Sequence, residues 1–150
     1  MKMVIDTKAN EMLVISTECT SCDVGIGQQK WDKSDPNNVT VGEPSDEINE
    51  SYSYLSDLSY KKTYLSGRYY ETQVCAAGYD NCGNNLKVFV VEDASPAMEI
   101  PYQGVIGFGL YEALGDVKEN NVLTQLVERQ YIASPTVGVF TGTNSSVESS

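Results

Sequence analysis

Short β-prone runs separated by polar loops are the feature of this sequence that most constrains its fold. The runs are rich in Val, Ile, Leu, Met, Tyr and Phe and cover residues 3–5, 12–15, 65–74 and 86–91. Between them lie loops rich in Asn, Asp, Ser, Gly and Pro, the longest from about residue 32 to residue 57. Apolar runs of this length, bounded by turn residues, are typical of strands. We therefore expect a mainly β protein.

One or two short helices are expected beside the strands, the clearest over residues 119–130. Its apolar residues recur at helical spacing and form one stripe, made by Val122, Leu123, Leu126 and Val127. Asn120 or Asn121 can cap its start, because an Asn side chain accepts hydrogen bonds from the first free amides of a helix. The apolar stripe predicts that this helix packs on the sheet.

Size and charge limit the domain organisation and the partners. The 150 residues suit one domain, which we place at residues 1–141, followed by a polar, Ser-rich tail at residues 142–150. Ten Lys and Arg against 21 Asp and Glu give a formal net charge of −11, which would repel a phosphate backbone. We expect no nucleic-acid partner. No apolar run approaches the roughly 20 residues that cross a bilayer, so no transmembrane segment is expected either.

The cysteines form two local pairs, Cys19 with Cys22 and Cys75 with Cys82, each flanked by polar turn residues. Such pairs suit short disulfide loops in an oxidising compartment. A four-cysteine zinc site is the alternative, although it usually shows two CxxC knuckles and only the first pair has that spacing. The chain has no histidine, which excludes Ser–His and Cys–His catalytic pairs and histidine metal sites. We expect no metal and no organic cofactor.

Three sequons would accept glycans in the secretory pathway, at Asn38, Asn49 and Asn144. With the cysteine pairs they favour the secretory pathway, in an extracellular or acidic lumenal compartment. The first residues reach Asp6 too soon to contain the apolar region of a signal peptide. We expect that a signal was removed or that the chain starts within a longer protein.

Several segments resemble, in their order along the chain, the amino-terminal lobe of a pepsin-like aspartic protease. Asp6 and Thr7 end one apolar run and precede a tight turn and a second apolar run, followed by the Cys19–Cys22 loop. The most specific match is Gln103-Gly104-Val105-Ile106-Gly107-Phe108-Gly109, which is similar to the family's Asp-Gly-Ile-Leu-Gly-Leu-Gly segment. Glycines there permit close packing behind the active-site strand.

A further segment resembles the hairpin flap that covers the substrate in this family. Leu58-Ser59-Tyr60 is followed by Leu65-Ser66-Gly67, and the resemblance gives Tyr60 the place of the tyrosine that leans over the substrate. Across about residues 1–140, the resemblance implies a single lobe of an acid-protease β-barrel. It also implies Cys19–Cys22 and Cys75–Cys82 pairing, and a catalytic role for Asp6 beside Thr7.

The chemistry of this family needs two carboxyls that share one proton, so that one acts as a base while the other donates. Only Asp6 lies in a matching turn, and no second Asp-Thr-Gly or Asp-Ser-Gly is present. The resemblance lacks a counterpart of the family's first strands and of its carboxy-terminal lobe. A missing second lobe, or another copy of the chain, would have to supply the partner carboxyl.

Residues around the expected site also depart from the family pattern. Lys8 replaces a glycine, adding a Cβ and a cation near Asp6, and Ala9 replaces a serine that orients the carboxylate. In the flap, Lys61 and Thr63 are bulkier than the glycines of the family pattern. In the binding wall, Leu13 stands in place of a tryptophan.

We therefore expect a protease-derived domain that is catalytically impaired and acts in protein or peptide binding or in assembly with a second lobe or subunit. An aspartic-type endopeptidase completed by a second lobe or chain is the alternative. A third reading is an unrelated secreted β domain that shares the motif order by chance.

Overall fold

The computed structural model describes residues 3–37, 40–56, 59–75, 82–100, 102–109 and 120–138. Its strands are β1 (Met3–Asp6), β2 (Met12–Ile15), β3 (Cys22–Val24), β4 (Thr40–Val41), β5 (Ile48–Ser56), β6 (Ser59–Cys75), β7 (Cys82–Ser95), β8 (Met98–Ile100) and β9 (Gly104–Gly107). One helix lies in the described part, α1 (Val122–Glu128). The protein is mainly β, as the strand pattern predicts.

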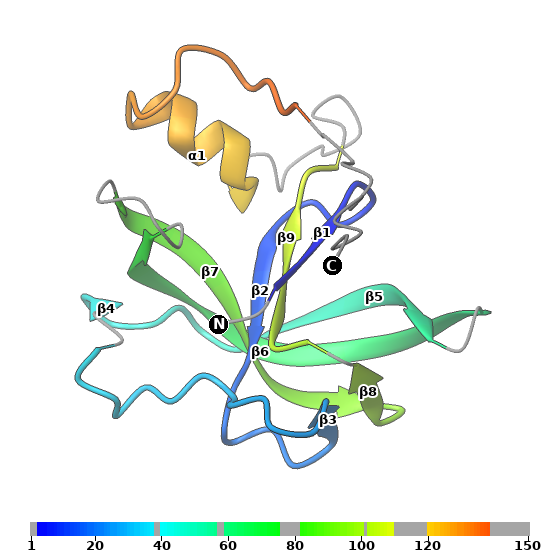
Figure 1. Ribbon diagram of the computed structural model, residues 1–150. Coiled ribbons are helices and arrows are strands. Elements are labelled where there is room, and N and C mark those ends of the chain that lie inside the picture. Colours follow the sequence, from blue (N-terminus) through cyan, green and yellow to red (C-terminus); the bar gives the residue numbers. More distant parts are fainter. Residues whose placement is uncertain are drawn as a thin grey trace, which may run out of the picture.

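Seven strands form one sheet that curls into a half-barrel (Figure 1). Its order is β1-β9-β2-β7-β6-β4, and β5 pairs with the amino-terminal half of β6. β9 lies between β1 and β2, parallel to β1 and antiparallel to β2. The order therefore brings the end of the chain's first strand beside a strand that lies about a hundred residues later. A separate two-stranded sheet joins β3 and β8.

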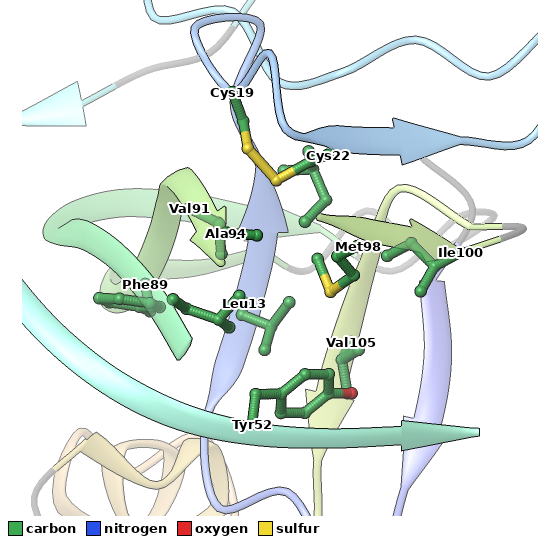
Figure 2. Close-up of a cluster of buried hydrophobic side chains, with 12 residues drawn as sticks. Leu13, Cys19, Cys22, Tyr52, Phe89, Val91, Ala94, Met98, Ile100 and Val105 are labelled. Atoms are coloured by element: carbon green, nitrogen blue, oxygen red, sulfur yellow. A yellow bond between two sulfur atoms is a disulfide. The ribbon is translucent and has the colours of Figure 1, made fainter. Parts of the chain in front are cut away.

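β2 is buried on both faces because apolar cores form on both sides of the sheet. Successive side chains of a strand point to opposite faces. Leu13 and Ile15 enter one core with Phe89 and Val105, and Figure 2 shows Leu13 beside Val105. Met12 and Val14 enter the other core with Trp31, whose ring lies 5.2 Å from that of Tyr70.

The second core is covered by α1, which lies above β7 and β9 in Figure 1. Asn121 caps the helix by accepting hydrogen bonds from Leu123 N at 3.0 Å and Thr124 N at 3.3 Å. Gln125 is fully buried and bonds Lys87 on β7 twice: its Oε1 accepts from the backbone nitrogen at 2.6 Å, and its Nε2 donates to the carbonyl at 3.1 Å. A polar side chain thus fixes the helix to the sheet.

Two element boundaries differ from those expected. The region 32–57 is not one long loop, because it contains β4 and the nine residues of β5. In β5 the inward residues Ile48, Glu50 and Tyr52 alternate with exposed Asn49 and Ser51, and the polar residues mask this two-residue period. The helix is shorter than 119–130, because Arg129 closes it and Gln130 takes a positive φ of 62°.

Both expected disulfides are present, Cys19–Cys22 and Cys75–Cys82. Cys19 and Cys22 are buried in the first core (Figure 2), where their loop supports the β3–β8 sheet through a 2.9 Å bond from Met98 N to Ser21 O. The second disulfide joins the ends of β6 and β7. Within the described ranges, no helix is long and apolar enough to cross a membrane.

Candidate functional site around the Asp6 turn

Asp6 ends β1, where it pairs with Gly107 of β9. Its Oδ1 accepts a 2.7 Å hydrogen bond from the backbone nitrogen of Lys8, and its carbonyl accepts one of 2.8 Å from Phe108 N. The carboxyl is partly buried, while Thr7 is exposed. The fold therefore presents a carboxyl at a strand end, in a turn fixed by its own side chain.

The glycines of β9 are needed because the turn after Asp6 passes close to that strand. A Cβ at Gly107 would lie 2.5 Å from the carbonyl oxygens of both Ala9 and Glu11. Gly107 N donates to Glu11 O at 2.9 Å, and Gly109 N donates to Ala9 O at 2.8 Å. The expectation that these glycines permit close packing behind the Asp6 strand is confirmed.

Lys8 is accommodated without a left-handed backbone. Positive φ angles in the described part belong to Gly27, Gly42, Asn85 and Gln130. The Lys8 side chain is exposed, and it is the backbone amide of this residue that bonds Asp6. Loss of the glycine therefore leaves the turn itself intact.

The hairpin of β5 and β6 rises beside this turn. Its register runs from Ser56 opposite Ser59 to Ile48 opposite Gly67. Ser66 and Gly67 thus lie at the base of the hairpin, where Ser66 Oγ donates to Glu47 at 2.7 Å and Gly67 packs against β7 at a bulge. Tyr60 lies near the tip opposite Leu55, and its side chain falls outside the described part.

A pocket of about 380 Å³ separates the Asp6 turn from the hairpin. One wall is the segment after Asp6, with Lys8, Ala9, Asn10 and Glu11, and the other is β5; the apolar lining comes from Leu13 and Leu65. Leu13 stands where the resemblance expects a tryptophan, and it contributes to the pocket wall. The pocket is a concave space beside a strand-end carboxyl, bounded by an extended hairpin.

Two carboxyls and a phenol meet at the wall of this pocket. Tyr69 of β6 hydrogen-bonds both Glu11 and Glu50, the latter at 3.0 Å from its Oε1. Burial, followed by the hydrogen bond and charge of Glu50, raises the pKa of Glu11 to about 9. Burial and the two carboxylates raise the pKa of Tyr69 as well, so that phenol stays neutral.

Tyr52 is the aromatic side chain of β5 that reaches toward Asp6. Its ring is 8% exposed and lies beside Leu13 and Val105 in Figure 2. Burial first, and then Tyr102 and Asp6, raise the pKa of its hydroxyl. Tyr52 is therefore a neutral phenol beside the Asp6 carboxyl, on the strand of the hairpin opposite to Tyr60.

Of the three expected glycosylation sites, the structure describes one, at Asn49. Asn49 is exposed on β5, and Ser51 of its sequon is exposed too. Asn38 and Asn144 lie outside the described residues, as do Asp57, Leu58 and the tail from residue 142. No group of three or more His, Cys, Asp or Glu residues that could hold a metal occurs among the residues that the structure describes.

The sequence did not reveal two pocket residues, Glu11 and Glu50, or Tyr69, whose hydroxyl contacts both. Glu50 shares the two-residue period of Ile48 and Tyr52, which marks it as inward-facing once β5 is recognised. Glu11 directly precedes the buried strand β2. Their meeting depends on the pairing of β5 with β6, which no local pattern gives.

Compared with known proteins, the chain matches no protein-family model and no curated protein sequence.

Proposed function

We propose that this chain is a protease-derived domain, similar to the amino-terminal lobe of a pepsin-like aspartic protease, that binds an extended peptide or protein segment without cleaving it. The observation that carries the proposal is the pocket of about 380 Å³ between the Asp6 turn and the β5–β6 hairpin. A concave space with convergent polar groups is the usual form of a binding site, and this pocket combines polar groups such as Asn10 and Glu50 with apolar Leu13.

Catalytic impairment follows from the carboxyls available near Asp6. Aspartic proteolysis needs two carboxyls that share a proton, one of them acting as base toward water. Glu11 and Glu50 both contact the hydroxyl of Tyr69 rather than the Asp6 side chain. Asp6 instead accepts from the backbone of Lys8. The chain alone therefore supplies one carboxyl in the expected place.

Peptide binding and cleavage can be tested separately. In one arm, pools of octapeptides are added to isotopically labelled protein at pH 5, and we expect amide shifts confined to residues 8–13 and 48–53. Glu128→Gln, an exposed change on α1, should leave these shifts unchanged. If no pool shifts these amides, the binding proposal is contradicted.

In the second arm, the chain is incubated with an acid-denatured protein between pH 3 and pH 6, and we expect no cleavage and no binding of a statine-type inhibitor. Inhibitor-sensitive cleavage that disappears in Asp6→Asn would instead support the alternative, an aspartic endopeptidase completed by a second lobe or chain. The partly buried Asp6 carboxyl beside a neutral Tyr52 is the observation that keeps this alternative open.

Disulfides and an exposed sequon residue at Asn49 support a secretory or extracellular location. A neutral Glu11 would be favoured further in an acidic lumenal compartment. Enzymatic removal of N-linked glycans from protein expressed in a secretory host would reveal a glycan at Asn49 as a loss of mass.

A further inference from the structure

The cluster of Glu11, Glu50 and Tyr69 joins the segment after Asp6 to the β5–β6 hairpin, beside the core contacts of Leu13 with Tyr52. Glu11 belongs to the segment after Asp6, whereas Glu50 and Tyr69 belong to the two strands of the hairpin. All three side chains are partly buried, and Phe89 of β7 packs behind the Tyr69 ring at 5.3 Å. The contact therefore bridges the two walls of the pocket, which Glu11 and Glu50 line.

A count of hydrogens shows that the cluster must hold an additional proton. The Tyr69 hydroxyl contacts both carboxyls, yet a phenol carries a single hydrogen and can donate to one of them. An ionised carboxylate only accepts. The second contact of the hydroxyl therefore needs a hydrogen on one carboxyl, and burial makes Glu11 the side chain that keeps it.

We propose that Glu11, Glu50 and Tyr69 form a proton-dependent latch that holds the base of the β5–β6 hairpin against the segment after Asp6. When the shared proton leaves for bulk solvent, two carboxylates face each other in a poorly hydrated place, and their repulsion separates the two walls of the pocket. The latch is closed at acidic and neutral pH and opens in alkaline solution.

Among the described residues, the groups that shift the pKa of Glu11 are Glu50 and Tyr69. Glu50 faces Glu11 from β5, Tyr69 faces it from β6, and β7 contributes the apolar Phe89 ring. On the same wall as Glu11 lie the exposed Lys8 and the Asp6 carboxyl, and from β5 comes the neutral phenol of Tyr52. Deprotonation therefore adds a net negative charge to an already acidic corner.

The role of the latch as a gate to the pocket rests on the proposed function, but the latch itself is measured without any ligand. Amide hydrogen exchange, corrected for the intrinsic effect of pH, is compared at pH 7 and pH 10. We expect protection of the amides of residues 48–52 to fall at least tenfold in the wild type. In Glu11→Gln the same amides should change less than threefold, because the amide stays neutral and still donates to Glu50.

Glu47→Gln is the matched control, since Glu47 is an exposed carboxylate at the same end of the hairpin that accepts from Ser66. It should keep the wild-type response. The amides of residues 86–91 in β7 must stay protected from exchange at both pH values. If their protection is lost together with that of the hairpin, the change is global unfolding and the latch proposal is wrong.

Two further measurements cover the case in which Glu11→Gln fails to fold. Glu50→Gln removes the facing carboxylate and should weaken the pH response, because ionised Glu11 then meets no second negative charge. In the wild type, the carboxyl carbon of Glu11 should report a protonated group at pH 7 by NMR. Titration of Glu11 near pH 4.5, or an unchanged hairpin at pH 10, would overturn the latch even if peptide binding holds. Failure of the peptide pools with a working latch would contradict only the binding function.

Discussion

Burial and a second carboxyl together decide the charge of Glu11. Its pKa rises from an ordinary value of 4.5 to about 9, with burial as the main cause and Glu50 next. A group whose folded pKa exceeds its unfolded one stabilises the fold fully below the unfolded value. That stabilisation declines as the pH rises and is lost once the pH passes the folded value.

The chain should therefore unfold more easily as the pH rises from about 4.5 to about 9. We expect the free energy of unfolding in urea to fall over this range by about 3–6 kcal/mol, since each pKa unit corresponds to about 1.4 kcal/mol. Glu11→Gln should flatten most of this dependence, while Glu47→Gln, which removes an exposed carboxylate, should keep it. Equal slopes in the two variants would contradict the assignment.

Gly107 leaves the space through which the turn after Asp6 passes. Gly107→Ala should lower the free energy of unfolding by about 1–3 kcal/mol, because the added methyl group would meet two backbone carbonyls that cannot rotate away. Gly138→Ala is the matched control, since nothing lies within 4 Å of a Cβ there. Chemical denaturation of both variants measures the difference, and equal stabilities would refute the packing argument.

α1 is held to the sheet by a polar contact as well as by its apolar stripe. Val122 is buried as the stripe predicts, but Leu123, Leu126 and Val127 are only partly buried, while Gln125 is fully buried. A helix of seven residues is too short to be stable alone. Its position therefore depends on Asn121 at its start and on Gln125 at its centre.

Gln125→Leu, a change of similar volume, should destabilise the protein by about 2–4 kcal/mol. The substitution leaves the backbone nitrogen and carbonyl of Lys87 without their side-chain partner, and each unsatisfied buried group costs about 1–3 kcal/mol. Glu128→Gln, an exposed change on the same helix, should have little effect. A Leu variant as stable as the wild type in urea would show that apolar packing fixes the helix.

Elements with an apolar pattern were predictable, and elements defined by pairing were not. The runs at residues 12–15 and 86–91 became strands because their side chains fill cores on both faces. The Asn121 cap followed from a local hydrogen-bonding rule. β5 was read as loop, since Asn49, Ser51 and Ser53 face solvent and its inward face includes a glutamate. The Asp6 turn was found from sequence, but its pocket required the placement of β5.

Charge should govern how whole molecules associate. We expect the purified chain to form dimers or larger assemblies, because β1 is an edge strand of the sheet and its Ile5 is 56% exposed. The net charge of −11 opposes contact between copies, and salt screens this repulsion. Association should therefore strengthen between 20 mM and 500 mM NaCl, as measured by sedimentation; a stable monomer at both salt concentrations would count against assembly.

The amide of Gln125 also determines where a foreign strand can be added to this molecule. β2 pairs with β7 only along Phe89–Val91. At Lys87, the edge of β7 on the β2 side therefore has no strand beside it. Gln125 occupies both hydrogen-bonding groups there, and Tyr131 accepts from the nitrogen of Asn84 further along the strand at 2.9 Å. The short helix and the segment after it thus block strand pairing at this edge of β7. Another chain therefore cannot add a strand there, as it would in a fibril.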